Sequence, residues 1–173
     1  LKRIVSIYIN NNLKTPVTYG LLKPKIILQS YILEDEELLK YVMMHELTHI
    51  KKFHILFNHI VNFVACVFWC NPLLIISLEY LEQDIEIYTD KEVISRLGDT
   101  IETRKDYCKS MFQLMSNSVK RDEVSLKLNP NLERMIIMKN YKKTILGSFI
   151  FALTFLFSIP VFASVVKLEK DRI

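Results

Sequence analysis

Polar and apolar positions alternate through the first residues of the chain. RIVSIYI at residues 3–9 alternates polar and β-branched side chains, as a strand does. NNNLKTP at 10–16 is typical of a turn, and VTYGLLKPKIILQ at 17–29 is a second extended region. We expect a small β-hairpin here that turns at Gly20 or at Lys23–Pro24, with the proline at an edge or a bulge because it has no backbone N–H.

The pattern then changes to a helical period. LEDEELLKYVMMHELTHIKKFH at 33–54 predicts one helix, with acids in its first turn and lysines near its end. The mostly apolar run at 55–81 is interrupted at Asn71–Pro72, where the proline predicts a turn or kink. The remaining predicted elements are an amphipathic helix at 79–98 that stops at Gly98, a helix at 100–118, a polar connector at 120–131 and a short helix at 132–143.

The stretch TILGSFIFALTFLFSIPVFASVV at 144–166 contains no charged residue. At 1.5 Å per residue it covers about 34 Å, against about 30 Å for the hydrocarbon core of a bilayer. We therefore predict a C-terminal transmembrane helix here. This prediction divides the chain into a main domain at 1–143, the membrane helix at 144–166 and an extracytoplasmic tail at 167–173.

Composition narrows the fold class and the compartment. Half of the 173 residues are hydrophobic and the mean hydropathy is +0.18, while Gly (3) and Pro (5) are scarce, which favours helices over a turn-rich β-sandwich. The net charge of +4 is modest and its Lys and Arg residues are spread out, so direct binding of nucleic acid is not indicated. Three cysteines without framework spacing predict free thiols, and place the main domain on the reducing, cytoplasmic side of a cell membrane.

The predicted helix at 33–54 carries the motif HELTH at 45–49. Residues four apart share one helix face, so His45 and His49 can bind one Zn²⁺ ion. Glu46 lies one step round the helix, where it can reach a water on the same ion and act as a base. Chance would produce this motif about 0.006 times in a chain of this composition, so it favours a metallopeptidase over a charged helix face.

A catalytic zinc usually has a third protein ligand, which must come from elsewhere in the chain. Glu86 and Asp90 share a helix face, so one could bind the ion while the other accepts a hydrogen bond from a ligand histidine. Glu82 and Glu86 have the same spacing, and the residues alone leave this choice open. The acidic candidates of this region are Glu79, Glu82, Asp84, Glu86, Asp90 and Glu92.

The apolar run bears on whether these ligands can meet. His49 and Glu86 lie at opposite ends of residues 55–81, and a helical hairpin folded at Asn71–Pro72 would bring them together. A single membrane crossing would place them on opposite sides of the bilayer, so it is incompatible with the site. His54 and His59 fit no ligand spacing with the motif, which favours packing or interfacial roles for both.

Several stretches in this order resemble the BlaR/MecR-type antirepressor metallopeptidases, over roughly residues 15–165. They are PVTYGLLKPKIIL, HELTHIKK, WCNPL, DIEIYTDKEV and LERMIIM, followed by an apolar segment. The resemblance implies Glu86 as third ligand and Asp90 as a support behind the ligands, beside His45, His49 and the base Glu46. The family often has Cys at the position of Thr89 and Asp at that of Phe53; neither is a proposed ligand.

The resemblance implies a fold and an activity. We expect a mainly α, membrane-associated, zincin-like metallopeptidase with an N-terminal β-hairpin, acting in signalling linked to antibiotic resistance. The segment with Tyr19, Gly20, Leu21 and Leu22 could bind substrate by β-augmentation, or could only pack on the helix. The expected partners are a protein substrate such as a transcriptional repressor, the chain itself through self-cleavage, the lipid bilayer, and a second copy in a homodimer.

Two alternative functions follow from the same residues. An HtpX-like membrane peptidase for quality control would use the same motifs. A non-catalytic membrane signalling module would use the metal only to hold its fold, and replacement of Glu46 by Gln distinguishes it from an enzyme.

Overall fold

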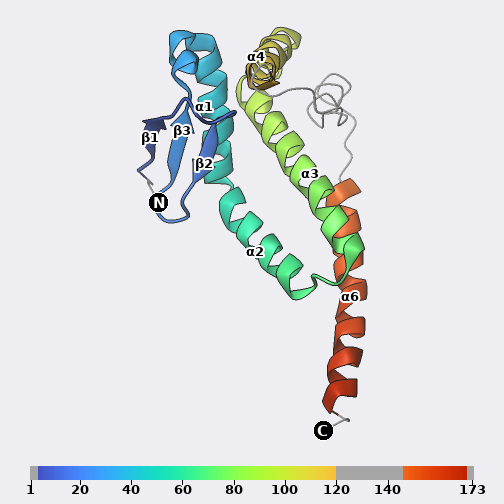
Figure 1. The fold of residues 1–173 in the computed structure, drawn as a ribbon. Helices are drawn as coiled ribbons and strands as arrows, with labels where there is room; N and C mark the ends of the chain where they lie inside the picture. Colours follow the sequence, from blue (N-terminus) through green and yellow to red (C-terminus); the bar gives the residue numbers. More distant parts are fainter. Residues whose placement is uncertain (1–3, 120–145, 171–173) are drawn as a thin grey trace. The chain divides into compact units, whose positions relative to one another are not determined.

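The structure is a computed structural model that describes residues 4–119 and 146–170. It is mainly helical with one small three-stranded sheet (Figure 1). The predicted connector at 120–131 and helix at 132–143 lie outside the described residues. The elements are strands β1 (Ser6–Ile9), β2 (Val17–Tyr19) and β3 (Lys25–Leu28), the 3-10 helix η1 (Ser30–Glu34), and helices α1 (Glu36–Lys51), α2 (His54–Val67), α3 (Pro72–Arg96), α4 (Ile101–Val119) and α6 (Leu146–Lys170).

The sheet has the strand order β1-β3-β2. β2 pairs antiparallel with β3, and the turn between them contains Gly20 at φ +87°. A Cβ atom on Gly20 would lie 2.6 Å from the carbonyl oxygen of Lys23, so the turn requires glycine. The predicted hairpin at Gly20 is therefore confirmed, but it was incomplete, because β1 adds a third strand in parallel with β3.

The core lies between the sheet and helices α1 and α4. On β3 the residues alternate, and Ile26 and Leu28 are fully buried toward α1. Along α1, Leu38, Val42 and His45 repeat at helical spacing on the buried side. Burial of each large apolar side chain contributes roughly 1.5–3 kcal/mol relative to exposure, which fixes the rotation of α1 about its axis. The first histidine of the motif thus faces inward because it belongs to the apolar stripe.

Helix α1 is shorter than the predicted helix at 33–54. Asp35 caps its N-terminus and accepts hydrogen bonds from the backbone N–H groups of Glu37 and Leu38, at 3.1 and 3.0 Å. At the other end Phe53 has φ +58°, a left-handed conformation that a continuous helix does not allow. The chain changes direction there, and His54 becomes the first residue of α2 instead of the last of α1.

The chain forms two compact units, residues 1–57 with 87–142 and residues 58–86 with 143–173. Within the second unit α6 runs antiparallel to the first part of α3. Asp84 accepts hydrogen bonds from the backbone N–H and the hydroxyl of Ser148, while Asn71 donates to Ser158. The predicted break at Asn71–Pro72 is confirmed, because α3 begins at Pro72. The helix predicted at 79–98 therefore begins earlier than expected, and it ends at Arg96, just before Gly98 at φ +101°.

Within the described residues, no helix combines the length and the apolar composition that crossing a membrane requires. The transmembrane helix predicted at 144–166 is therefore not supported, and that region forms α6. The prediction relied on the length of an uncharged run.

Candidate metal centre

The two histidines of the motif present the same ring nitrogen to each other. The Nε2 atoms of His45 and His49 lie 3.1 Å apart, and their ring centroids 4.8 Å apart. Two imidazoles on one tetrahedral zinc at about 2.0–2.1 Å would have their nitrogens about 3.3 Å apart. The spacing of these two donors therefore fits a shared metal ion with a shift of a few tenths of an ångström.

A carboxylate completes this donor group. One ligand atom each of His45, His49 and Glu86 lies within 4.8 Å of the other two. Glu86 lies on α3, about one helical turn before Asp90. Two nitrogens and one carboxylate oxygen form a donor set that suits zinc in a site with one open position.

The other acidic candidates on α3 are engaged elsewhere or exposed. Asp84 binds Ser148, and Glu92 forms an ion pair with Arg96 at 2.7 Å. Glu79 and Glu82 are exposed. Of the alternatives that the residues left open, Glu86 is therefore the carboxylate that lies beside both histidines.

Behind His45 lies a buried polar group. The Nδ1 atom of His45 is 3.1 Å from Oδ1 of Asp90 and 3.0 Å from the hydroxyl of Tyr107. Tyr107 donates a hydrogen bond of 2.6 Å to the same Asp90 oxygen, and both side chains have no exposed surface. A carboxylate on Nδ1 favours the proton at that atom and leaves the lone pair on Nε2. Sequence reasoning missed Tyr107, because no motif distinguishes one tyrosine of α4.

Behind His49 lies another imidazole. The Nδ1 atoms of His49 and His54 are 3.0 Å apart, and their rings meet edge to face at 4.9 Å. His54 is only 9% exposed and also lies 3.4 Å from the Thr89 hydroxyl through Nδ1. His54, for which we expected a packing or interfacial role, packs directly against the candidate ligand His49. His59 is exposed on α2.

Glu46 is half-buried, and its carboxylate accepts a hydrogen bond from the hydroxyl of Thr18 on β2. β2 forms one edge of the sheet. Of the predicted substrate-binding residues, Tyr19 ends this edge strand and Gly20 forms the turn. Leu21 and Leu22 follow in the turn and are exposed. The candidate base and the candidate substrate segment therefore meet through Thr18.

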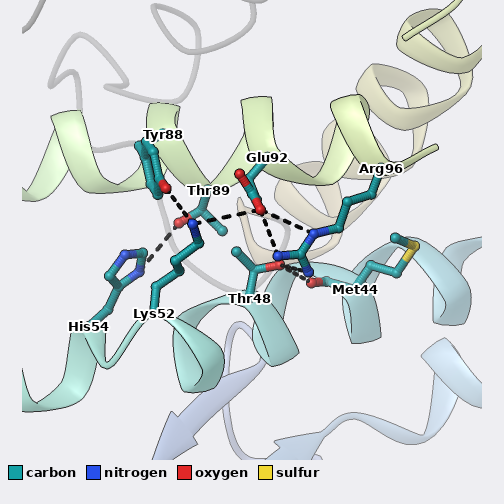
Figure 2. Close-up of polar contacts among 8 residues, drawn as sticks. All are labelled: Met44, Thr48, Lys52, His54, Tyr88, Thr89, Glu92 and Arg96. Carbon is teal, nitrogen blue, oxygen red and sulfur yellow. Dashed lines mark hydrogen bonds and ion pairs between the residues drawn. The ribbon is translucent and has the colours of Figure 1, made fainter. Parts of the chain in front are cut away.

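A second set of polar contacts joins α1 to α3 in the first unit (Figure 2). Lys52 donates to the hydroxyl of Tyr88 at 2.6 Å, and this hydrogen bond raises the pKa of Lys52. The hydrogen bond from Arg96 lowers the pKa of Glu92; burial opposes this effect, and Lys52 at 3.7 Å adds to it. Arg96 also reaches the Thr48 hydroxyl at 3.5 Å, so these contacts hold α3 against the motif helix.

Comparison with known proteins places the chain in a family. The sequence profile of the BlaR1 peptidase M56 family matches residues 1–139. The chain belongs to the BlaR1 peptidase M56 family. The resemblance drawn from the motifs is thereby confirmed.

Curated relatives of this M56 chain include two methicillin resistance mecR1 proteins, from Staphylococcus aureus strain Mu50 and from Staphylococcus epidermidis. Each is 30% identical over 99 residues, which cover 56% of this chain and 17% of the relative. The regulatory protein BlaR1 of Bacillus licheniformis is 33% identical over 86 residues, which cover 49% of this chain and 14% of that protein. The chain thus spans less than a fifth of the length of the relatives it matches.

Proposed function

We propose that this chain is a zinc-dependent endopeptidase that cleaves itself or a regulatory protein. The observation that carries the proposal is the convergence of ligand atoms from His45, His49 and Glu86 in a chain of a peptidase family. Glu46 directly follows His45 in the sequence. A group of this kind, in a partly buried position, is the arrangement that metal-assisted peptide hydrolysis requires.

His45, His49 and Glu86 would hold the metal, and Asp90 would orient His45 from behind. A bound zinc ion supplies a Lewis acid that polarises a carbonyl oxygen and lowers the pKa of a water molecule. The nitrogen-rich donor set favours zinc over magnesium or calcium, which prefer oxygen ligands.

Glu46 would accept a proton from the attacking water and pass it to the leaving amine of the peptide. The hydrogen bond from Thr18 holds its carboxylate toward the sheet. An extended substrate could add a strand at the β2 edge, beside Tyr19 and the turn with Gly20, Leu21 and Leu22. Since Thr18 lies on β2, substrate and base would be aligned by the same strand.

The nature of the substrate is inferred from the relatives. Their names describe a regulatory protein and proteins of methicillin resistance, which supports a regulatory protein, such as a transcriptional repressor, as the substrate. Location at a cell membrane with the site on the cytoplasmic side, and a homodimer, stay predictions. An HtpX-like quality-control peptidase is the second candidate, because the same motif residues would serve either substrate.

The decisive experiment separates metal binding from catalysis. Zinc content and self-cleavage are measured for the wild type, His45→Ala and Glu46→Gln, with Glu92→Gln as a control acid outside the donor group. We expect His45→Ala to lose stoichiometric zinc. Glu46→Gln should keep the zinc but cleave about 10²–10⁴-fold more slowly, the usual contribution of a general base. Equal zinc in wild type and His45→Ala would end the metal hypothesis, and undiminished cleavage by Glu46→Gln would favour a non-catalytic metal.

A further inference from the structure

We propose that His54 is a positioning residue for His49: its Nδ1 atom accepts the Nδ1 proton of His49 and so keeps the lone pair of His49 on Nε2, toward the metal. This inference rests on the proposed function, because it concerns a ligand of the proposed metal site. It adds to that function a residue outside the HELTH motif.

The argument begins with the orientation of the two ligand rings. Because the Nε2 atoms of His45 and His49 face each other at 3.1 Å, the Nδ1 atom of each ring points away from the donor group. Asp90 lies at the Nδ1 atom of His45, and His54 lies at the Nδ1 atom of His49, at nearly equal distances of 3.1 and 3.0 Å. Each ligand histidine therefore has a polar partner at Nδ1, which is a carboxylate for His45 and an imidazole for His49.

The proton assignment follows from the short distance between the imidazoles. Two ring nitrogens 3.0 Å apart can form a hydrogen bond only if one carries a proton and the other a lone pair. A histidine that binds metal through Nε2 carries its proton on Nδ1. His49 is then the donor, and His54 is a neutral acceptor whose own proton is on Nε2.

A helix break at Phe53 and two residues of α3 hold His54 in this position. On an unbroken helix, a residue five positions after His49 would be rotated by about 140° and could not meet it. The left-handed Phe53 ends α1 and removes this restriction. Thr89 contacts the ring nitrogen from α3, and the ring of Tyr88 lies edge to face at 6.1 Å. The close-up shows His54 directed at Thr89 across the two helices (Figure 2).

An imidazole also suits the charge of the site better than a further carboxylate would. The donor group already contains Glu86, and Asp90 lies 3.1 Å from the Nδ1 atom of His45. A second buried carboxylate behind His49 would add another negative charge, which like-charge repulsion makes costly. A neutral acceptor fixes the ring without that penalty.

The test uses the whole chain labelled with ¹⁵N-histidine, which is tractable because the chain has 4 histidines. His54→Phe keeps a planar ring but removes the acceptor, while His54→Asn places an acceptor oxygen near the position of Nδ1. The exposed His59 supplies the matched control, His59→Phe. Zinc affinity is measured by competition with a chelator, and ring tautomers are read from ¹⁵N shifts.

We expect His54→Phe to weaken zinc binding about 10–100-fold, the usual effect of losing a ligand's hydrogen-bond partner. His54→Asn should recover most of this loss, and His59→Phe should bind as the wild type does. In the zinc-loaded wild type, His54 should be protonated at Nε2 and His49 at Nδ1.

Each contrary result has a separate meaning. A wild type that binds no zinc refutes the proposed function itself. A wild type that binds zinc while His54→Phe binds equally well overturns the role of His54 alone. The ring tautomers of the wild type test the role of His54 even if His54→Phe does not fold. If His54 carries its proton on Nδ1 in the zinc-loaded wild type, it cannot accept a hydrogen bond from His49 at that atom.

Discussion

Replacement of Tyr107 by Phe removes one hydroxyl from the buried polar group behind His45, where it contacts both Asp90 and His45. The Tyr107 hydroxyl donates to Asp90 at 2.6 Å, and neither side chain has exposed surface. The phenylalanine ring would keep the edge-to-face contact with Tyr41, at 5.7 Å between centroids. The substitution therefore removes an oxygen and a donor while it leaves the apolar packing in place.

The magnitude follows from the charge of the acceptor. A hydrogen bond to a charged group contributes about 1.5–3 kcal/mol, whereas one between neutral groups contributes about 0.5–1.5 kcal/mol. We expect Tyr107→Phe to lower the free energy of unfolding by about 2 kcal/mol, because a buried carboxylate loses a donor. In an Asp90→Asn background the same change should cost about 1 kcal/mol, since the acceptor is then neutral.

The assay is urea unfolding of the metal-free chain at neutral pH with a chelator present, followed by circular dichroism. The chelator removes the contribution of metal binding to stability. Tyr8→Phe is the control, because Tyr8 is 48% exposed and should change stability by less than about 0.5 kcal/mol. If Tyr107→Phe unfolds at the wild-type urea concentration, or loses the same stability in both backgrounds, the hydroxyl does not stabilise the carboxylate.

Three further predictions concern Thr18, Glu92 and Cys108. Thr18→Val removes the donor to Glu46 while it keeps the side-chain shape, so we expect kcat for substrate cleavage to fall about tenfold. Thr18→Ser should restore kcat, and an unchanged kcat in Thr18→Val would contradict a role of Thr18 in positioning Glu46. The pKa of Glu92 is lowered in the folded chain, so its stabilisation is present above its unfolded pKa and is lost as the pH falls. Glu92→Gln should therefore cost about 0.5 kcal/mol at pH 7 and progressively less as the pH falls through the folded pKa of Glu92, as urea unfolding would measure. Burial, with a smaller contribution from the Asp90 charge, raises the pKa of the Cys108 thiol, so iodoacetamide should alkylate it more slowly than the two exposed cysteines, as peptide mass spectrometry would show.

The parts of the fold that sequence patterns predicted depend on local signals. Gly20 marked the hairpin turn, because its backbone conformation excludes other residues. Asn71–Pro72 marked a helix break, because proline cannot continue the preceding helix. The spacing of His45 and His49 placed both rings on one face of α1, because helix geometry alone determines that relation.

The parts that were missed depend on contacts between distant segments. Tyr107 meets His45 across 62 positions, and Thr18 meets Glu46 across 28, so no periodicity or motif within one helix indicates either pair. The parallel pairing of β1 with β3 is likewise non-local. His54 was assigned only a packing role because its spacing was compared with positions on a continuous helix. The left-handed Phe53 makes that comparison invalid.

The short connection between α1 and α2 restricts where insertions and deletions are tolerated. Only Lys52 and Phe53 separate the two helices. One inserted residue would lengthen the path by up to about 3.8 Å, more than the 3.0 Å that joins the rings of His49 and His54. Related sequences that keep both histidines should therefore preserve the number of residues between them, while length differences collect in exposed connections such as residues 10–16.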